Sequence, residues 1–140
     1  MDSIRIAFRE PTVEDKSFIF NSWLKSYRNS GFAKPMCNEV YFKNHKKRVE
    51  SLLLDSLVTI VCNPDDKNQI YGYAVYKLLP GNILLLHYVY VKYTFRKLGI
   101  AKALHDSINV DRETMLCTHY TDSAKRLEKK FDFVYDPYRY

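Results

Sequence analysis

Apolar and polar positions in the first third of the chain follow the period of a strand and then of two helices. Residues 4–8 alternate apolar with polar or small side chains, as a strand with one buried face does. Residues 13–27 place apolar side chains near one helical face, and Thr12 is suited to cap that helix, with Asp15 completing an approximate capping box. After a loop, a second helix is predicted from beyond Asn38 to about residue 54.

The middle of the chain carries the pattern of a β-meander. Residues 57–62 form a β-branched run, and two longer apolar runs follow over residues 70–79 and 83–91. The sequence Pro80-Gly81-Asn82 joins these two runs and predicts a tight reversal. Gly72 lies inside a predicted strand, which indicates a bulge or a close approach of another backbone.

The last third alternates helix and strand. A helix is predicted over residues 100–108, a strand over 115–119, a helix over 121–130 and a strand over 133–135. The element order is therefore β-α-α-β-β-β-α-β-α-β. It predicts a single α+β domain over residues 1–140, with a mostly antiparallel central sheet flanked by about four helices.

Composition places the chain among globular proteins. It has 140 residues, of which 46% are hydrophobic and 27% charged. No apolar run approaches the ~20 residues that span a bilayer, and the first residues lack a signal-peptide core, so no membrane association and a cytoplasmic location are expected. The three cysteines are far apart and form no C-x-x-C pair, so no metal site is expected.

Positive charge points to anionic partners. The formal net charge is +6 and the pI is near 9.2, which suits a phosphorylated cofactor, a nucleic acid or an acidic protein. Residues 43–48 hold much of this charge on the second predicted helix. That run is either a solvated helix face or a binding surface for an acidic or nucleic-acid partner.

The stretch from residue 89 to residue 103 joins a strand to a helix through a basic turn. It contains the pattern Arg96-x-x-Gly99-x-Ala101, surrounded by Lys92, Lys97 and Lys102. The unpaired backbone N–H groups at the start of a helix, together with the helix dipole, form a site for a phosphate or pyrophosphate. The alternative is an ordinary βα turn in which the glycine eases packing.

In these residues the chain resembles the GNAT superfamily, the Gcn5-related N-acetyltransferases. The element order is similar to that fold over nearly the whole length, and Ile70-Tyr71-Gly72-Tyr73 resembles its third strand. Val89-Tyr90-Val91 followed by Arg96-x-x-Gly99-x-Ala101 resembles its acetyl-CoA motif, and Ala124-x-x-Leu127 leading to Phe133 resembles its last helix and strand. The segment HYVYVK is also similar to phage-encoded members.

The resemblance implies a function for the basic turn. The family transfers an acetyl group from acetyl-CoA to an amine that attacks the thioester directly, in a sheet splayed at its fourth strand. Backbone N–H groups of the turn and helix start would hold the pyrophosphate, and the end of the fourth strand would hold the pantetheine arm. The expected cofactor-binding residues are Val89, Tyr90, Val91, Arg96, Lys97, Leu98, Gly99, Ile100 and Ala101.

The resemblance also implies catalytic positions. The family's fourth-strand carboxylate corresponds to His87, whose imidazole can accept a proton near neutral pH; a partly buried structural histidine is the alternative. The family's tyrosine of the last helix, which protonates the thiolate, corresponds to Glu128, and a glutamate serves as an acid only with a raised pKa. Tyr120, His119 and Asp122, just after the fifth predicted strand, are the other candidates for the acid.

The acceptor is expected to be a small-molecule or protein amine. Tyr27, Tyr41 and Tyr93 are candidates to line its cleft or to stack on a base. The short chain after Phe133 leaves the acceptor side open or completed by a second subunit, so a monomer and a homodimer are both expected alternatives. Two other functions remain open: a nucleic-acid-binding or nucleic-acid-modifying protein of this fold, and a CoA-binding member without catalysis.

Overall fold

The computed structural model describes residues 4–108, 114–129 and 132–139, and it confirms the predicted element order with one added 3-10 turn. Lys130, the predicted end of the last helix, lies outside the described residues. No helix in the described part of the chain is both long and apolar enough to cross a membrane. The elements are β1 (Ala7–Arg9), α1 (Asp15–Tyr27), α2 (Asn38–Leu54), β2 (Leu57–Asn63), β3 (Asp66–Leu79), β4 (Ile83–Val91), η1 (Tyr93–Phe95), α3 (Ile100–Ile108), β5 (Thr114–Cys117), α4 (Asp122–Glu128) and β6 (Phe133–Tyr135).

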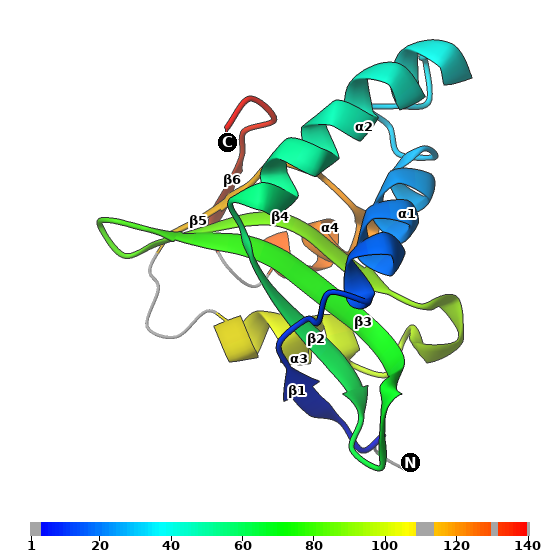
Figure 1. Ribbon diagram of the computed structural model, residues 1–140. Helices are drawn as coiled ribbons and strands as arrows, with labels where there is room; N and C mark the ends of the chain where they lie inside the picture. Colours follow the sequence, from blue (N-terminus) through cyan, green and yellow to red (C-terminus); the bar gives the residue numbers. More distant parts are fainter. Residues whose placement is uncertain (1–3, 109–113, 130–131, 140) are drawn as a thin grey trace.

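The strands form one mixed sheet in the order β1-β2-β3-β4-β5-β6 (Figure 1). The strands β2, β3 and β4 pair antiparallel, as the meander pattern predicts, and β1 also pairs antiparallel with β2. In contrast, β4 pairs with β5 and β5 with β6 in parallel. A parallel neighbour needs a crossover, which the segments containing α3 and α4 provide. This is the predicted α+β architecture, with four helices around a mostly antiparallel sheet.

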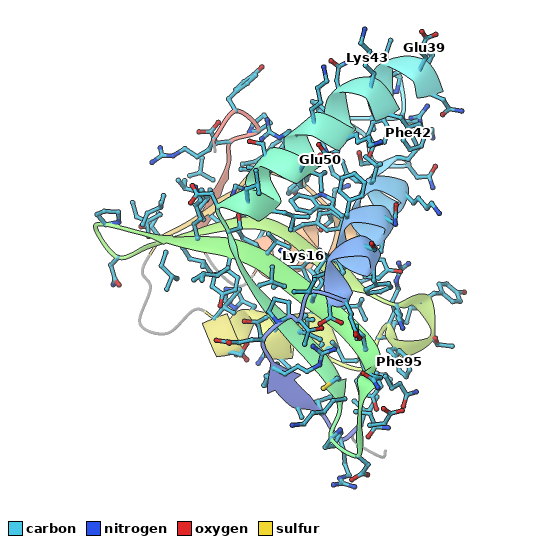
Figure 2. All side chains as sticks on the ribbon, viewed as in Figure 1. Lys16, Glu39, Phe42, Lys43, Glu50 and Phe95 are labelled. Atoms are coloured by element: carbon cyan, nitrogen blue, oxygen red, sulfur yellow. The ribbon has the colours of Figure 1, made fainter. Side chains whose placement is uncertain are left out.

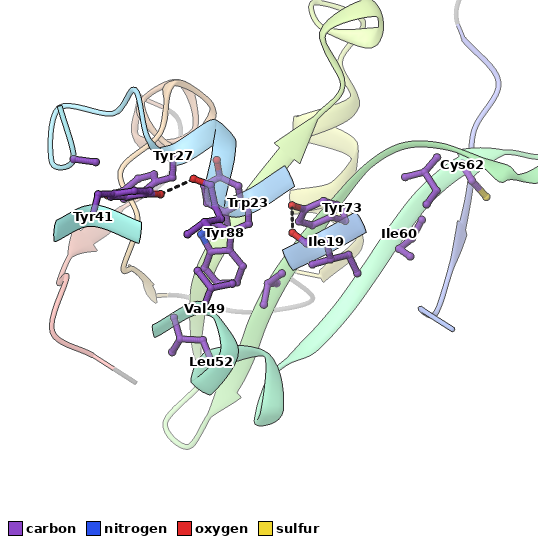
Figure 3. Packing of buried hydrophobic residues seen from close by; sticks show 14 residues of the cluster. Ile19, Trp23, Tyr27, Tyr41, Val49, Leu52, Ile60, Cys62, Tyr73 and Tyr88 are labelled. Atoms are coloured by element: carbon purple, nitrogen blue, oxygen red, sulfur yellow. Dashed lines mark hydrogen bonds between the residues drawn. The ribbon is translucent and has the colours of Figure 1, made fainter. Parts of the chain in front are cut away.

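Helices cover both faces of the sheet. On one face α1 and α2 pack on a cluster of aromatic residues (Figures 1 and 3). There Trp23 is fully buried and stacks on Tyr88 with 5.1 Å between ring centroids, and the Tyr41 hydroxyl donates to Leu24 O at 2.6 Å. On the other face, α3 buries Ile100, Leu104 and Ile108, its predicted apolar stripe, against the sheet. Burial of large apolar side chains on both faces fixes the sheet between the helix layers.

The first helix begins later than predicted. Thr12 is not its N-cap: α1 starts at Asp15, and Glu14 occupies the cap position without a side-chain cap bond. One half of the predicted capping box is present, because the Asp15 carboxylate accepts the Thr12 N–H at 2.7 Å. The same carboxylate accepts the guanidinium of Arg9 at 2.7 and 3.2 Å, so an ion pair joins the start of α1 to β1.

The basic run over residues 43–48 divides between two sides of α2. His45 is buried, and Arg48 donates to the carbonyl oxygen of Pro137. Of the basic side chains in this run, Lys43, Lys46 and Lys47 are exposed. Lys43 projects from the outer end of the helix in Figure 2.

Gly72 has the close backbone contact that its position in a strand predicts. A Cβ there would lie 2.3 Å from Tyr90 O in β4, a distance that no side chain tolerates. The register also shifts next to it, because Val61 pairs with Gly72 while Cys62 pairs with Ile70. The glycine thus lets β3 approach the part of β4 where the strand leaves its other neighbour.

Candidate functional site

The strands β4 and β5 separate half-way along β4. Their parallel pairing ends at Leu86 and Cys117, and a last bond runs from Thr118 N–H to Leu86 O at 3.1 Å. Beyond this point β4 continues to Val91, while the chain after β5 turns into α4. A cleft of about 750 Å³ opens between them, which is a usual size for a small-molecule or cofactor site.

One wall of the cleft is the exposed edge of β4. The Lys92 N–H donates to Tyr71 O in β3 at 2.9 Å, and main-chain groups of an antiparallel strand alternate in direction. Tyr90 therefore pairs toward β3, and the main-chain groups of Val89 and Val91 point toward the cleft. The Arg96 Nε–H donates a hydrogen bond to Val91 O at 2.9 Å, which confirms that this carbonyl points away from β3. The edge can accept an extended ligand as an additional strand would be accepted.

The end of the cleft is the basic turn and the start of α3. Lys97 and Gly99 have φ angles of 66° and 80°, in the left-handed region, so consecutive N–H groups can converge on one point as they do in anion-binding nests. The first helical bond in α3 runs from Ala103 N–H to Gly99 O. By helix geometry, the N–H groups of Ile100, Ala101 and Lys102 have no partner within the helix.

The surroundings of this turn fit a pyrophosphate. A Cβ on Gly99 would have no atom within 4 Å, so there is open space directly beside the helix start. The residues that line the cleft include five cations and one carboxylate: Arg96, Lys97, Lys102, Lys125, Arg126 and Asp122. The helix dipole and these charges together favour an anion of high charge.

The structure brings together most of the predicted cofactor-binding residues. Eight of them line the cleft, namely Val89, Tyr90, Val91, Arg96, Lys97, Gly99, Ile100 and Ala101. Leu98 does not: its side chain is 47% exposed and absent from the cleft wall.

A comparison with solved structures finds 71 matching chains. A candidate acetyl transfer protein from Pyrococcus furiosus has a TM-score of 0.66 at 19% identity, over 90% of this chain and 91% of that one. An acetyltransferase of the GNAT family from Staphylococcus aureus Mu50 has a TM-score of 0.50 at 19% identity, and the match covers 74% of this chain and 63% of that chain. The PaiA N-acetyltransferase from Thermoplasma acidophilum, in complex with coenzyme A, has a TM-score of 0.54 at 19% identity, and the match covers 74% of this chain and 69% of that chain.

The chain has the GNAT fold. No protein-family model matches the sequence, and a search of curated proteins finds no match either. Identities below 20% explain why the likeness is visible in the fold and in a few motif positions, and not along the sequence as a whole. The fold confirms the predicted strand order and the splay at the fourth strand of the sheet.

Within this GNAT fold, His87 lies behind the point where β4 and β5 separate. Val75 pairs with Tyr88 and Tyr76 with Leu86, so His87 is the extra residue of a β-bulge. Its side chain is fully buried and does not line the cleft. Its Nδ1 lies 2.9 Å from Thr118 Oγ1, and burial together with the nearby cations lowers its pKa to about 4.

Of the two predicted acids, only Tyr120 lies in the cleft wall. The Lys125 ammonium lies 5.4 Å from the centre of its ring. Desolvation and the neighbouring Glu128 carboxylate raise the pKa of Tyr120, so its hydroxyl keeps its proton at neutral pH. Glu128 is exposed and is not part of the cleft wall.

Other candidates divide between the cleft and the core. Tyr27 and Asp122 line the cleft, whereas Tyr41 and His119 are buried and Tyr93 is 84% exposed outside it. No sequence pattern predicts the wall formed by the end of α1 and its loop, or the two cations of α4, because only the fold brings them to β4. Nor does any pattern mark Tyr88, Phe95 and Thr121 as part of the cleft. The lining residues that were not predicted are Ser26, Asn29, Ser30, Gly31, Tyr88, Phe95, Thr121, Lys125 and Arg126.

Within residues 4–108, 114–129 and 132–139, no group of three or more His, Cys, Asp or Glu side chains is placed to hold a metal ion.

Proposed function

We propose that the protein is an acyl-CoA-dependent N-acyltransferase, which transfers an acetyl group from acetyl-CoA to an amine. The observation that carries this proposal is the cleft itself. It joins an open strand edge at Val89 and Val91 to a helix start with two left-handed residues and open space beside Gly99. An extended, hydrogen-bonding arm that ends in a pyrophosphate is complementary to that combination.

Each part of coenzyme A has a counterpart in the cleft. The N–H groups from Lys97 to Ala101 and the neighbouring cations would bind the pyrophosphate. The main-chain groups of Val89 and Val91 would pair with the amides of the pantetheine arm. Acetyl-CoA then supplies its thioester carbonyl as the electrophile.

The acceptor would enter from the side of Ser26 to Gly31, which faces the strand edge across the cleft. Its nitrogen forms a bond to the carbonyl carbon while the carbon–sulfur bond breaks. Tyr120, which lines the cleft, would then give its hydroxyl proton to the departing sulfur. The amine must also lose a proton, and solvent or a basic side chain must take it.

Release of the coenzyme A thiol tests this proposal. We expect acetyl-CoA and a panel of amines, comprising polyamines, amino acids, aminoglycosides and lysine peptides, to yield free thiol with at least one class. The rate should fall by at least tenfold in Tyr120→Phe, since general acids contribute about 10²–10⁴-fold. Binding of acetyl-CoA without transfer to any amine would contradict this proposal and would indicate a CoA-binding protein without catalysis.

A second function, nucleic-acid binding, is favoured by the exposed Lys43, Lys46 and Lys47 on the outer side of α2. These three lysines lie apart from the cleft wall, so a phosphate backbone on α2 would not require the cleft. Binding to duplex DNA or RNA should weaken steeply with salt. Replacing the three lysines with glutamine should remove it, and unchanged or salt-independent binding would exclude this function.

A further inference from the structure

A serine of α1 and a tyrosine of β4 bring their hydroxyl groups together at the cleft. Ser26 and Tyr88 both belong to the cleft wall, and their hydroxyl oxygens lie 2.5 Å apart. Tyr88 is the second residue after Leu86, where β4 and β5 part, and it is 4% exposed, whereas Ser26 is half-buried. The pair therefore lies beside the point where the strands separate, and Ser26 gives it access to the cleft.

The protons of both hydroxyl groups are already used in hydrogen bonds. Ser26 Oγ lies 2.5 Å from Ser22 O, the carbonyl one turn earlier in α1, and two oxygens come this close only with a proton between them. Ser26 therefore donates to that carbonyl, and Tyr88 donates to Ser26. Burial raises the pKa of Tyr88 to about 12, so its hydroxyl keeps that proton at neutral pH.

This arrangement leaves only hydrogen-bond acceptors for a ligand. A hydroxyl group has one proton and two lone pairs. Within the described part of the chain, the two bonds use one lone pair of Ser26 and none of Tyr88. A group that binds here must bring the hydrogen itself, as an amine does. A carbonyl or carboxylate oxygen of a ligand would instead meet lone pairs and be repelled.

The preceding turn of α1 carries the same kind of pair outside the cleft. Ser22 Oγ lies 2.6 Å from Phe18 O and 2.7 Å from the Tyr73 hydroxyl of β3. Neither Ser22 nor Tyr73 belongs to the cleft wall. That pair serves the packing of α1 on the sheet, whereas the pair of Ser26 and Tyr88 has the same chemistry at a place that a ligand can reach.

The wall that follows the pair is held in place by Arg28. Its guanidinium donates to Asn38 Oδ1 at 2.8 Å, to Ala33 O at 2.8 Å and to Met36 O at 2.6 Å. These bonds fix the loop after α1, in which residues 29–31 line the cleft. A second substrate therefore meets a surface that is already formed, which reduces the entropy cost of binding it.

We propose that the hydroxyl pair of Ser26 and Tyr88 binds the acceptor amine, whose N–H groups donate to the two oxygens. The inference rests on the proposed N-acyltransferase function and adds to it the site of the second substrate. Because neither hydroxyl is charged, the pair does not stabilise an ammonium ion as a carboxylate would. It can therefore hold the neutral amine that the attack requires. Both residues bind and orient the nitrogen, and neither takes its proton.

Steady-state kinetics test this site with the amine that the wild type acetylates fastest. Ser26→Ala and Tyr88→Phe should each raise KM for the amine by about three- to tenfold, the usual contribution of one hydrogen bond, with KM for acetyl-CoA unchanged. Ser22→Ala and Tyr73→Phe remove the equivalent groups one turn away and should leave both KM values unchanged. An unchanged KM for the amine in both cleft variants, or an equal rise in the two control variants, would overturn the inference.

A binding measurement separates this inference from the proposed function. n-Butylamine is titrated at pH 7 into protein whose tyrosines carry ¹³C at Cζ, with and without coenzyme A. The Tyr88 signal, assigned by its absence in Tyr88→Phe, should shift with the amine, and the Tyr73 signal should not. A shift of Tyr88 without acetyl transfer to any amine would support the amine site and refute the N-acyltransferase function alone. No shift of Tyr88 under either condition would overturn the amine site.

Discussion

Gly99 and Gly81 form a matched pair for testing the anion site. Both are exposed glycines in the left-handed region, with φ angles of 80° and 82°. Gly99 lies beside the start of α3, whereas Gly81 lies in the reversal between β3 and β4. Replacement of either by glutamate adds the same charge and the same backbone strain, about 1–2 kcal/mol for a side chain in this conformation. Only the change at Gly99 places a carboxylate where the pyrophosphate is expected.

The expected effect follows from linkage. Acetyl-CoA at 100 times its Kd stabilises a folded protein by about 2.7 kcal/mol. Unfolding entropies near 2.1 cal/mol/K per residue give about 0.3 kcal/mol/K for this chain, so the ligand should raise Tm by about 9 °C. The strain alone should lower Tm by roughly 3–7 °C in both variants.

Differential scanning fluorimetry with and without acetyl-CoA measures both the rise in Tm caused by the ligand and the fall in Tm caused by the strain. We expect the rise of about 9 °C in the wild type and in Gly81→Glu, and no rise in Gly99→Glu. Circular dichroism at 20 °C confirms that both variants are folded. A full rise in Gly99→Glu, or its loss in Gly81→Glu as well, would refute the assignment of the pyrophosphate to this turn.

Three further predictions concern stability and chemistry. The Arg9 ion pair lowers the pKa of Asp15 from 3.8 to about 2, which corresponds to about 2 kcal/mol of stability at pH 7 that is lost as pH falls from about 4 toward 2. Asp15→Asn should therefore be less stable than the wild type by about that amount in urea at pH 7, and a gap of the same size at pH 2 would contradict the ion pair. Gly72→Ala should lose about 1–3 kcal/mol in urea, because its Cβ would meet Tyr90 O and force β3 from β4; a loss under about 0.5 kcal/mol would show that the strands adapt. Tyr120→Phe should lower kcat by at least tenfold with an unchanged thermal shift by acetyl-CoA, and unchanged kcat would exclude the hydroxyl as the acid.

The fold was predictable because the apolar positions of each element repeat with the period of a helix or of a strand. The bounds of β4, α3 and β6 match the apolar runs and stripes that the sequence displays. The start of α1 was not predictable in this way. Thr12 has the chemistry of an N-cap, but α1 begins at Asp15, whose carboxylate also binds the guanidinium of Arg9 from β1.

The site was predictable only where it is continuous in sequence. The basic turn is contiguous, so the pattern from Arg96 to Ala101 reveals it. Lys125 and Arg126 reach the same cleft from α4, and nothing near them in the sequence indicates a common ligand. The apolar run over residues 83–91 correctly predicts that His87 lies in a strand, but its place in a bulge follows only from the pairing of β4 with β3.

The hydroxyl pair of Ser26 and Tyr88 could not be foreseen for the same reason. Its members come from α1 and β4, and they are 62 residues apart. A serine and a tyrosine in separate elements give no hint of each other. Their meeting results from the packing of α1 on the sheet.

The measurement that tests the central claim most directly is a crystal structure with coenzyme A bound. We expect its pyrophosphate within hydrogen-bond distance of the N–H groups of Gly99, Ile100 and Ala101. The pantetheine arm should pair with Val89 and Val91, and the sulfur should lie near Tyr120. Coenzyme A seated on the lysines of α2, or a cleft that stays closed to it at saturating concentration, would contradict the account.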